Sequence, residues 1–109
     1  MKQYEIWWAD LPLPAGRRPV LLLSRDPSYR YLTKVLAVEV TSTVREIPVE
    51  VPLGKPEGMK RACVANCDNI RVVSVARLRE RIGSLGRSRV PELKRATGYA
   101  FGWEELMDL

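Results

Sequence analysis

The run Pro19–Ser24, PVLLLS, constrains the fold of this chain more than any other stretch. A proline followed by consecutive large aliphatic residues is typical of a strand that is covered on both faces. Proline suits the first position of such a strand, where a backbone N–H is least needed. Two arginines, Arg17 and Arg18, stand directly before the run. They are either a solvated strand end or groups held in place to meet an anion.

Four further segments predict strands. They are Glu5–Asp10, Lys34–Ser42, 45–54 and 61–75. In the third, aliphatic residues alternate with Pro48, Glu50 and Pro52, which predicts an edge strand whose second face meets water. In the fourth, Asn66–Asn69 predicts a break, so that this segment is one long bent strand or two short ones. Between the strands, Arg25–Thr33 predicts a polar loop with Asp-Pro turn chemistry.

The pattern changes to a helical period after Ser74. The segment 74–83 predicts a short helix with Ser74 as N-cap and Gly83 as its end. The segment 88–107 predicts a second helix, capped by Ser88, with Pro91 early enough to be tolerated and glycines that weaken its end. The predicted fold class is therefore α+β, with a small, strongly curved antiparallel sheet or partial barrel finished by helices.

Length and composition agree with one small globular domain spanning residues 1–109. The chain has 109 residues, of which 46% are hydrophobic and 28% are charged, and this balance argues against wholesale disorder. No apolar run approaches the roughly 20 residues that cross a bilayer, so no membrane partner is expected. The first residues lack the apolar core of a secretory signal, and a cytoplasmic location is expected.

The charge balance favours a polyanionic partner. Lys and Arg total 18 against 13 Asp and Glu, a net charge of +5, which fits nucleic acid or an acidic protein, although a merely basic surface is the simpler explanation. The chain has no histidine, which removes the usual general acid and base at neutral pH and the commonest metal ligand. Catalysis, if any, must work without them.

The two cysteines do not indicate a metal site. Cys63 and Cys67 stand four residues apart, and the chain has neither a second cysteine pair nor a histidine to complete a zinc site. On one strand their side chains share a face, where a disulfide between them is geometrically poor. We interpret both as small apolar fillers.

Polar residues at the ends of apolar strands are the candidate functional residues. The pairs are Arg17 with Arg18, Thr41 with Ser42, and Asp68 with Asn69. Each pair has a simpler structural explanation, because strand ends are solvated, threonine favours strands, and Asp-Asn favours turns. Together they indicate an anion site, provided that the fold brings them to one edge of the sheet. No Gly-rich phosphate loop and no nucleophile elbow is present.

Four blocks in order resemble the MazF/PemK toxin family. They are EIWWADL, GRRPVLLLSRD, VEVTS and CVANCDNIRVV, and they span nearly the whole chain. The corresponding family patterns are an acidic-aromatic opening ending in W, an R-P-V-L-V strand, an [IV]-T-[ST] strand end and a D-x-[IV]-R-T-[IV] strand. Each block alone is a moderately specific match to the family, and four blocks in this order are a strong match.

The resemblance implies a small SH3-like, CcdB/PemK-type curved barrel with C-terminal helices that forms a homodimer. It implies a sequence-specific endoribonuclease toxin that needs no cofactor or metal and cuts single-stranded RNA (mRNA, tRNA or rRNA). The cut proceeds by 2′-OH attack and leaves a 2′,3′-cyclic phosphate and a 5′-OH. The implied protein partner is a cognate antitoxin with an acidic tail. The alternatives are a CcdB-like toxin that binds DNA gyrase without cutting and a plain basic RNA-binding module.

The resemblance also assigns candidate site residues. Arg18 matches the family's arginine before proline, Thr41 matches its threonine, and Asp68 matches the aspartate used in one branch of the family. That branch also uses an arginine two residues earlier, where this chain has Asn66. The residues expected to contact RNA outside the catalytic set are Arg17, Ser42, Asn69 and Arg25.

The adjacent Trp7 and Trp8 point to opposite faces of one strand. One is expected to enter the core while the other stays partly exposed. The exposed indole either stacks on an RNA base or lies in a dimer interface, and the structural role is favoured.

Overall fold

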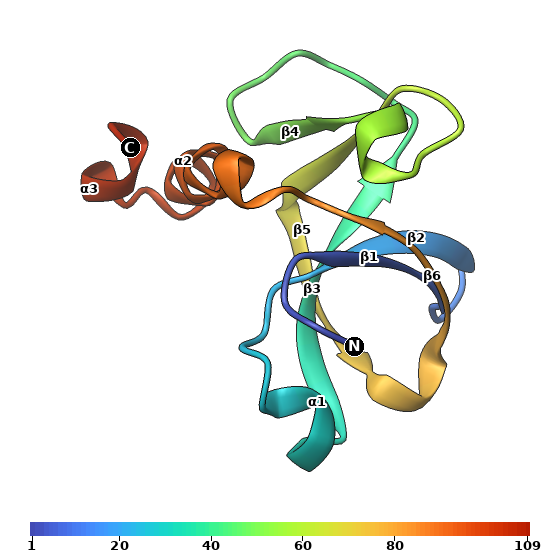
Figure 1. The fold of residues 1–109 in the computed structure, drawn as a ribbon. Helices are drawn as coiled ribbons and strands as arrows, with labels where there is room; N and C mark the ends of the chain where they lie inside the picture. The colour runs from blue at the N-terminus through green and yellow to red at the C-terminus, as the bar shows by residue number, and fades with distance from the viewer.

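The structure, a computed structural model that describes all of residues 1–109, is a curled antiparallel sheet with its two C-terminal helices together at one side (Figure 1). The strands are β1 (Glu5–Asp10), β2 (Arg17–Leu22), β3 (Lys34–Thr41), β4 (Glu50–Leu53), β5 (Cys63–Ser74) and β6 (Leu78–Ser84). The helices are α1 (Ser28–Tyr31), α2 (Val90–Phe101) and α3 (Glu104–Met107), with 3₁₀ turns at Lys55–Glu57, Val75–Arg77 and Arg87–Arg89. The predicted α+β class with a small curved barrel and C-terminal helices is confirmed.

The six strands form one sheet in the order β4-β5-β3-β2-β1-β6, with antiparallel pairing throughout. The central strand β2 is buried on both faces, as its apolar run predicts. Leu21 belongs to one hydrophobic cluster, while Val20 and Leu22 belong to a second cluster on the opposite face. Burial on both faces fixes the position and register of β2 in the sheet. The strand in turn positions the two arginines at its start.

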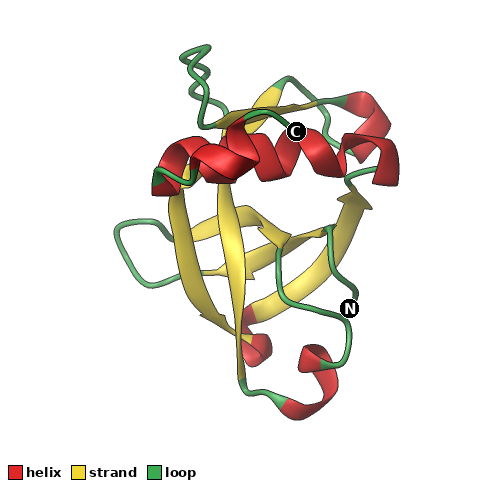
Figure 2. Cartoon of the chain, turned by 90° about the vertical axis from the view of Figure 1, so that its left-hand side faces the viewer, coloured by secondary structure: helices red, strands yellow, loops and turns green.

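Helix α2 closes the larger cluster. It lies across the strands in Figure 2. Its Leu93 and Ala96 are buried members of the larger cluster. The helix ends at Phe101 because Gly102 takes a left-handed conformation, with φ of 72°, that ends the hydrogen-bonded spiral. The predicted single helix 88–107 is thus two helices. The predicted Ser88 cap is wrong, because Arg89 holds the N-cap position and no side chain caps the helix.

The predicted helix over 74–83 is wrong, because strand β6 occupies Leu78–Ser84. The neighbouring strand β1 forms backbone hydrogen bonds with this segment. Two arginines of β6 also bind carboxylates of β1. Arg79 lies 2.5 Å from Asp10, and Arg81 lies 2.9 Å from Glu5. These long-range pairs override the local helical spacing of the apolar residues.

Two smaller predictions also need correction. Helix α1 lies within the predicted polar loop Arg25–Thr33. On the edge strand β4, Glu50 does not face water: its side chain is buried, and its carboxylate accepts the backbone N–H groups of Arg45 and Glu46 at 3.1 and 2.8 Å. A buried carboxylate needs such partners, and here it fixes the loop that follows β3.

The predicted interruption in the cysteine-bearing segment is a bend within the single strand β5. The register runs from Val38 opposite Ile70 to Val40 opposite Ala65, so residues 66–69 stand opposite the one β3 residue between them. Extra residues on one strand of a pair bend it, and this bend contributes to the curl of the sheet. No helix of the chain is long and apolar enough to span a membrane.

Candidate functional site

A surface pocket of about 680 Å³ lies where β2 begins and β3 ends. Its lining residues are Trp8, Arg17, Arg18, Pro19, Val40, Thr41, Ser42, Gly58, Met59, Lys60, Arg61, Cys63 and Ile82. Four of these thirteen are Arg or Lys, and none is Asp or Glu. A concave surface whose charged residues are all positive attracts phosphate groups.

Antiparallel pairing explains why distant polar residues meet here. Val20 of β2 pairs with Glu39 of β3, so the start of β2 lies beside the end of β3. This brings Arg17 and Arg18 next to Thr41 and Ser42 in the lining of one pocket. The condition that the sequence left open, that these pairs share one edge of the sheet, is met for these four residues.

The Arg18 side chain is held at one edge and free at its end. Its Nε lies 3.8 Å from Oε1 of Glu39, and its side chain is 34% exposed. The two terminal nitrogens have no hydrogen-bond or ion-pair partner within the protein. A guanidinium in this state can present its paired donors to an anion in the pocket.

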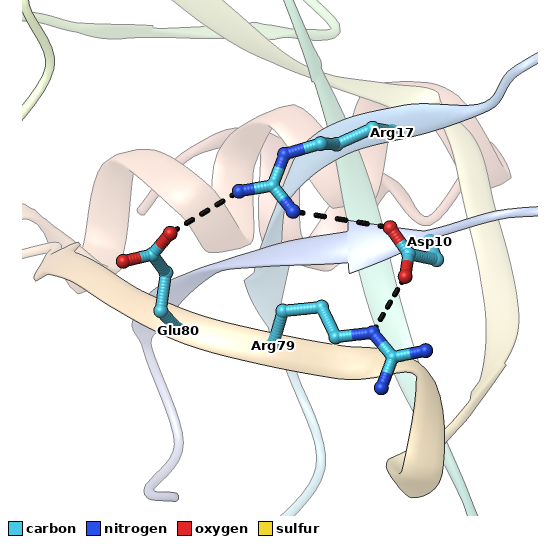
Figure 3. Close-up of polar contacts among 4 residues, drawn as sticks. All are labelled: Asp10, Arg17, Arg79 and Glu80. Atoms are coloured by element: carbon cyan, nitrogen blue, oxygen red, sulfur yellow. Dashed lines mark hydrogen bonds and ion pairs between the residues drawn. The ribbon is translucent and has the colours of Figure 1, made fainter.

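Arg17 differs from its neighbour, because carboxylates already engage it (Figure 3). Its terminal nitrogens lie 3.2 Å from Glu80 and 3.9 Å from Asp10, whose other oxygen binds Arg79. The guanidinium also lies 4.8 Å above the Trp8 ring, a cation–π contact. The two arginines therefore sit on opposite sides of β2, as expected for neighbours in a strand, while both reach the pocket.

The two hydroxyl residues stand at the end of β3. Thr41 Oγ1 accepts the backbone N–H of Thr43 at 3.1 Å, which fixes the oxygen and leaves the hydroxyl hydrogen free to donate. Ser42 is exposed in the next position. A fixed hydroxyl beside a free guanidinium can hold one phosphate from two directions.

The segment after the first 3₁₀ turn is a part of the site that the sequence pattern does not predict. Lys60 and Arg61 are exposed there and line the same pocket as the arginines of β2. The only signal in the sequence is two adjacent cations before Cys63, and a turn with solvated lysine and arginine looks the same. Their place in the pocket follows from a contact between distant segments.

Two glycines make that contact possible. A Cβ on Gly83 of β6 would lie 2.0 Å from the carbonyl oxygen of Glu57, and a Cβ on Gly58 would lie 2.5 Å from the carbonyl oxygen of Ile82. Gly58 also has a φ of 91°, a conformation that other residues rarely adopt. The backbones therefore touch, and the segment that carries Lys60 is fixed against β6.

An ion pair ties the same turn to helix α2. The buried Glu57 carboxylate accepts the Gly54 N–H at 2.6 Å and lies 3.3 Å from Arg89. Arg89 also binds Glu92, and this hydrogen bond is the main reason that the pKa of Arg89 is raised. The buried carboxylate holds this turn, because losing Arg89 would leave its charge uncompensated and losing the Gly54 N–H would leave an acceptor unsatisfied.

Three predicted site residues do not line this pocket. Asp68 and Asn69 are exposed on β5 at its bend, and Arg25 is exposed ahead of α1. Asn66, which stands where one family branch has an arginine, is buried and accepts the Asp68 N–H at 2.9 Å. It therefore shapes the bend.

The cysteines are free and buried, as predicted for apolar fillers. Cys63 lies at the wall of the pocket, and its thiol donates to the Arg61 carbonyl at 3.4 Å. Burial raises the pKa of the Cys67 thiol to about 11, so this thiol stays protonated at neutral pH.

The two tryptophans are both partly buried, on opposite faces of β1. Trp7 packs against the smaller cluster and donates its indole N–H to Glu5 at 3.1 Å. Trp8 lines the pocket beneath Arg17. A larger hollow of about 790 Å³ contains Trp7 and Tyr29, but it contains none of the predicted site residues.

Comparison with known proteins gives consistent results. Residues 2–101 match the model of the PemK-like, MazF-like toxin of type II toxin–antitoxin systems. The chain is 39% identical to endoribonuclease MazF3 of Mycobacterium tuberculosis over 84 residues. This match covers 77% of this chain and 82% of that protein.

Solved structures agree with the family match. The toxin MazF-mt6 of M. tuberculosis superposes with a TM-score of 0.84 at 37% identity, over 90% of this chain and 96% of the other. A mycobacterial endoribonuclease in complex with its cognate antitoxin gives a TM-score of 0.81 at 25% identity, over 94% and 96% of the two chains. The chain belongs to the PemK-like, MazF-like toxin family of type II toxin–antitoxin systems.

Proposed function

We propose that this chain is a sequence-specific endoribonuclease toxin that cuts single-stranded RNA at the pocket between β2 and β3. The observation that carries the proposal is that Arg18, whose guanidinium end is free, and Thr41 line one pocket whose charged residues are all cations. Relatives at 36–39% identity, which are named endoribonucleases or probable endoribonucleases, support the activity.

In the proposed reaction the RNA supplies its own nucleophile. The 2′-oxygen bonds to the adjacent phosphorus, the bond from phosphorus to the 5′-oxygen breaks, and the 5′-oxygen leaves with a proton. The proton of the 2′-OH passes to an acceptor. The products are a 2′,3′-cyclic phosphate and a 5′-OH. The protein must align this attack and stabilise the extra charge that develops on the phosphoryl oxygens.

The side chains of the pocket suit these two tasks. Arg18 donates its paired terminal N–H groups to the non-bridging oxygens, where the negative charge grows in the transition state. The fixed Thr41 hydroxyl donates to the same phosphate and sets its orientation. Asp68, which is exposed on β5 outside the pocket, stays a predicted candidate for the proton transfer.

The surrounding cations suit the RNA backbone. Arg17, Lys60 and Arg61 line the pocket with Ser42 and would hold phosphates on either side of the cut. We assign no metal to this reaction, because the guanidinium of Arg18 supplies the charge that stabilises the transition state.

The proposed protein partners are a cognate antitoxin with an acidic tail and a second copy of the chain. A cation-lined pocket and a net charge of +5 suit an acidic segment laid over the RNA site. A similar mycobacterial endoribonuclease forms a complex with its cognate antitoxin, which supports the same arrangement here.

Incubation of the purified chain with a long RNA in excess EDTA tests the proposal. We expect discrete fragments with 5′-OH ends, because neither the nucleophile nor the charge stabilisation comes from a metal. Activity that EDTA abolishes and added metal restores would contradict the metal-free reaction. Intact RNA would contradict the proposed endoribonuclease activity. Gyrase inhibition, or RNA binding without cleavage, would then identify a non-catalytic binder.

A further inference from the structure

Glu39 of β3 lies next to Arg18, on the same side of the sheet. It pairs with Val20, which is two residues from Arg18 on β2, and it does not line the pocket itself. Its side chain is 17% exposed, and its Oε1 lies 3.8 Å from Nε of Arg18. The carboxylate therefore forms an ion pair with the guanidinium at Nε, while the two terminal nitrogens have no partner within the protein.

A second arginine holds Glu39 from the other side. Arg71 of β5 donates through its Nη1 to Oε2 of Glu39 at 3.0 Å. The Nε of Arg71 is buried and has no hydrogen-bond partner, so the bond to Glu39 is the polar contact that fixes this side chain. The cluster contains two guanidinium groups and one carboxylate, and it keeps a net positive charge for a phosphate.

We propose that Glu39 is a positioning residue for Arg18, and that Arg71 anchors it. This inference rests on the proposed function, because it assigns Arg18 to the reacting phosphate. Arginine has a long side chain whose rotamer freedom is costly to remove at the moment of reaction. A carboxylate that contacts Nε keeps the fork aimed at the pocket before RNA arrives. Glu39 thus acts through Arg18 and touches no reacting atom.

The test compares Glu39→Gln and Glu39→Ala with the wild-type chain on an RNA oligonucleotide that the wild type cuts. Glu39→Gln keeps the shape and removes the charge, and Glu39→Ala removes the contact. We expect Glu39→Ala to lower kcat on the order of 10- to 100-fold, because displacing a catalytic group by about 1 Å has effects of this size. Glu39→Gln should lower kcat less. KM should change little, because Glu39 does not contact RNA.

Glu104→Gln is the matched control. It makes the same change in net charge at an exposed residue of α3, outside the pocket, and should leave kcat unchanged. Thermal melts followed by circular dichroism give the folded fraction of each variant, and Glu39→Gln keeps the test valid if Glu39→Ala fails to fold.

Wild-type kcat in both Glu39 variants, or an effect confined to KM, would overturn the inference. Its failure is separable from failure of the proposed function. If Arg18→Ala is inactive while both Glu39 variants are fully active, the function stands and only the positioning role is lost. If Arg18→Ala cuts RNA normally, the catalytic assignment of Arg18 is wrong, and the positioning role of Glu39 falls with it.

Discussion

Arg18→Ala is expected to lower kcat for RNA cleavage on the order of 10²- to 10³-fold, the usual effect of removing one donor to a transition-state oxyanion. The reason is the free end of the guanidinium, which faces a pocket lined with Thr41 and further cations. Alanine removes both charge and donors at the phosphorus, where charge develops. Rates of oligonucleotide cleavage under single-turnover conditions measure this effect directly.

Arg30→Ala is the control for the loss of one positive charge. Arg30 is exposed on α1 and lies outside the pocket, so its replacement should leave kcat unchanged. Circular dichroism should give the same spectrum for both variants and the wild type. Undiminished cleavage by a folded Arg18→Ala variant would contradict the assignment of Arg18.

Gly83→Ala is expected to destabilise the fold by about 2–3 kcal/mol, which corresponds to a fall in Tm of roughly 10–20 °C for a domain of this size. The added Cβ would lie 2.0 Å from the carbonyl oxygen of Glu57 and 3.2 Å from Cα of Gly58. Both are backbone atoms, so the turn before Lys60 has to shift as a unit. Differential scanning calorimetry measures the fall in Tm.

Gly86→Ala is the matched control for the glycine substitution. A Cβ on Gly86 meets no atom within 4 Å, and its φ of −64° suits alanine. This variant should keep or slightly raise Tm, because alanine restricts the unfolded chain. Equal melting temperatures for the two variants would show that the close approach of β6 to the turn is absent in solution.

The sequence predicted the strands that local patterns determine. The apolar run after Pro19 predicts a strand buried on both faces, and β2 places alternate residues in two separate clusters. The β-branched segment from Lys34 is the strand β3. These predictions held because burial of a continuous apolar run depends little on which strand lies beside it.

Long-range contacts explain the failures. The spacing of Leu78 and Ile82 suits a helix face, but pairing with β1 and the carboxylates of Glu5 and Asp10 makes this segment a strand. Glu50 alternates like a water-facing residue, yet it is buried beneath the loop whose N–H groups it accepts. Neither partner can be read from the local sequence.

The candidate site divides in the same way. Arg18 and Thr41 stand out in the sequence as polar residues at strand ends and as matches to family motifs, and the pairing of β2 with β3 brings them together. Lys60 reaches the pocket only through the backbone contact of the glycines, and Glu39 reads as an ordinary polar residue of a strand. The roles of Lys60 and Glu39 depend on contacts between distant segments, and sequence periodicity does not specify such contacts.

A single 2′-deoxy substitution in the RNA tests the central claim most directly. An oligonucleotide that the chain cuts at one bond is prepared again with 2′-deoxyribose on the 5′ side of that bond, which leaves the phosphate and both bases unchanged. The proposed reaction predicts no cleavage at this bond, because the attacking 2′-oxygen is gone, while the substituted strand should still compete with RNA for binding. Cleavage at the same bond of the substituted strand would contradict the account.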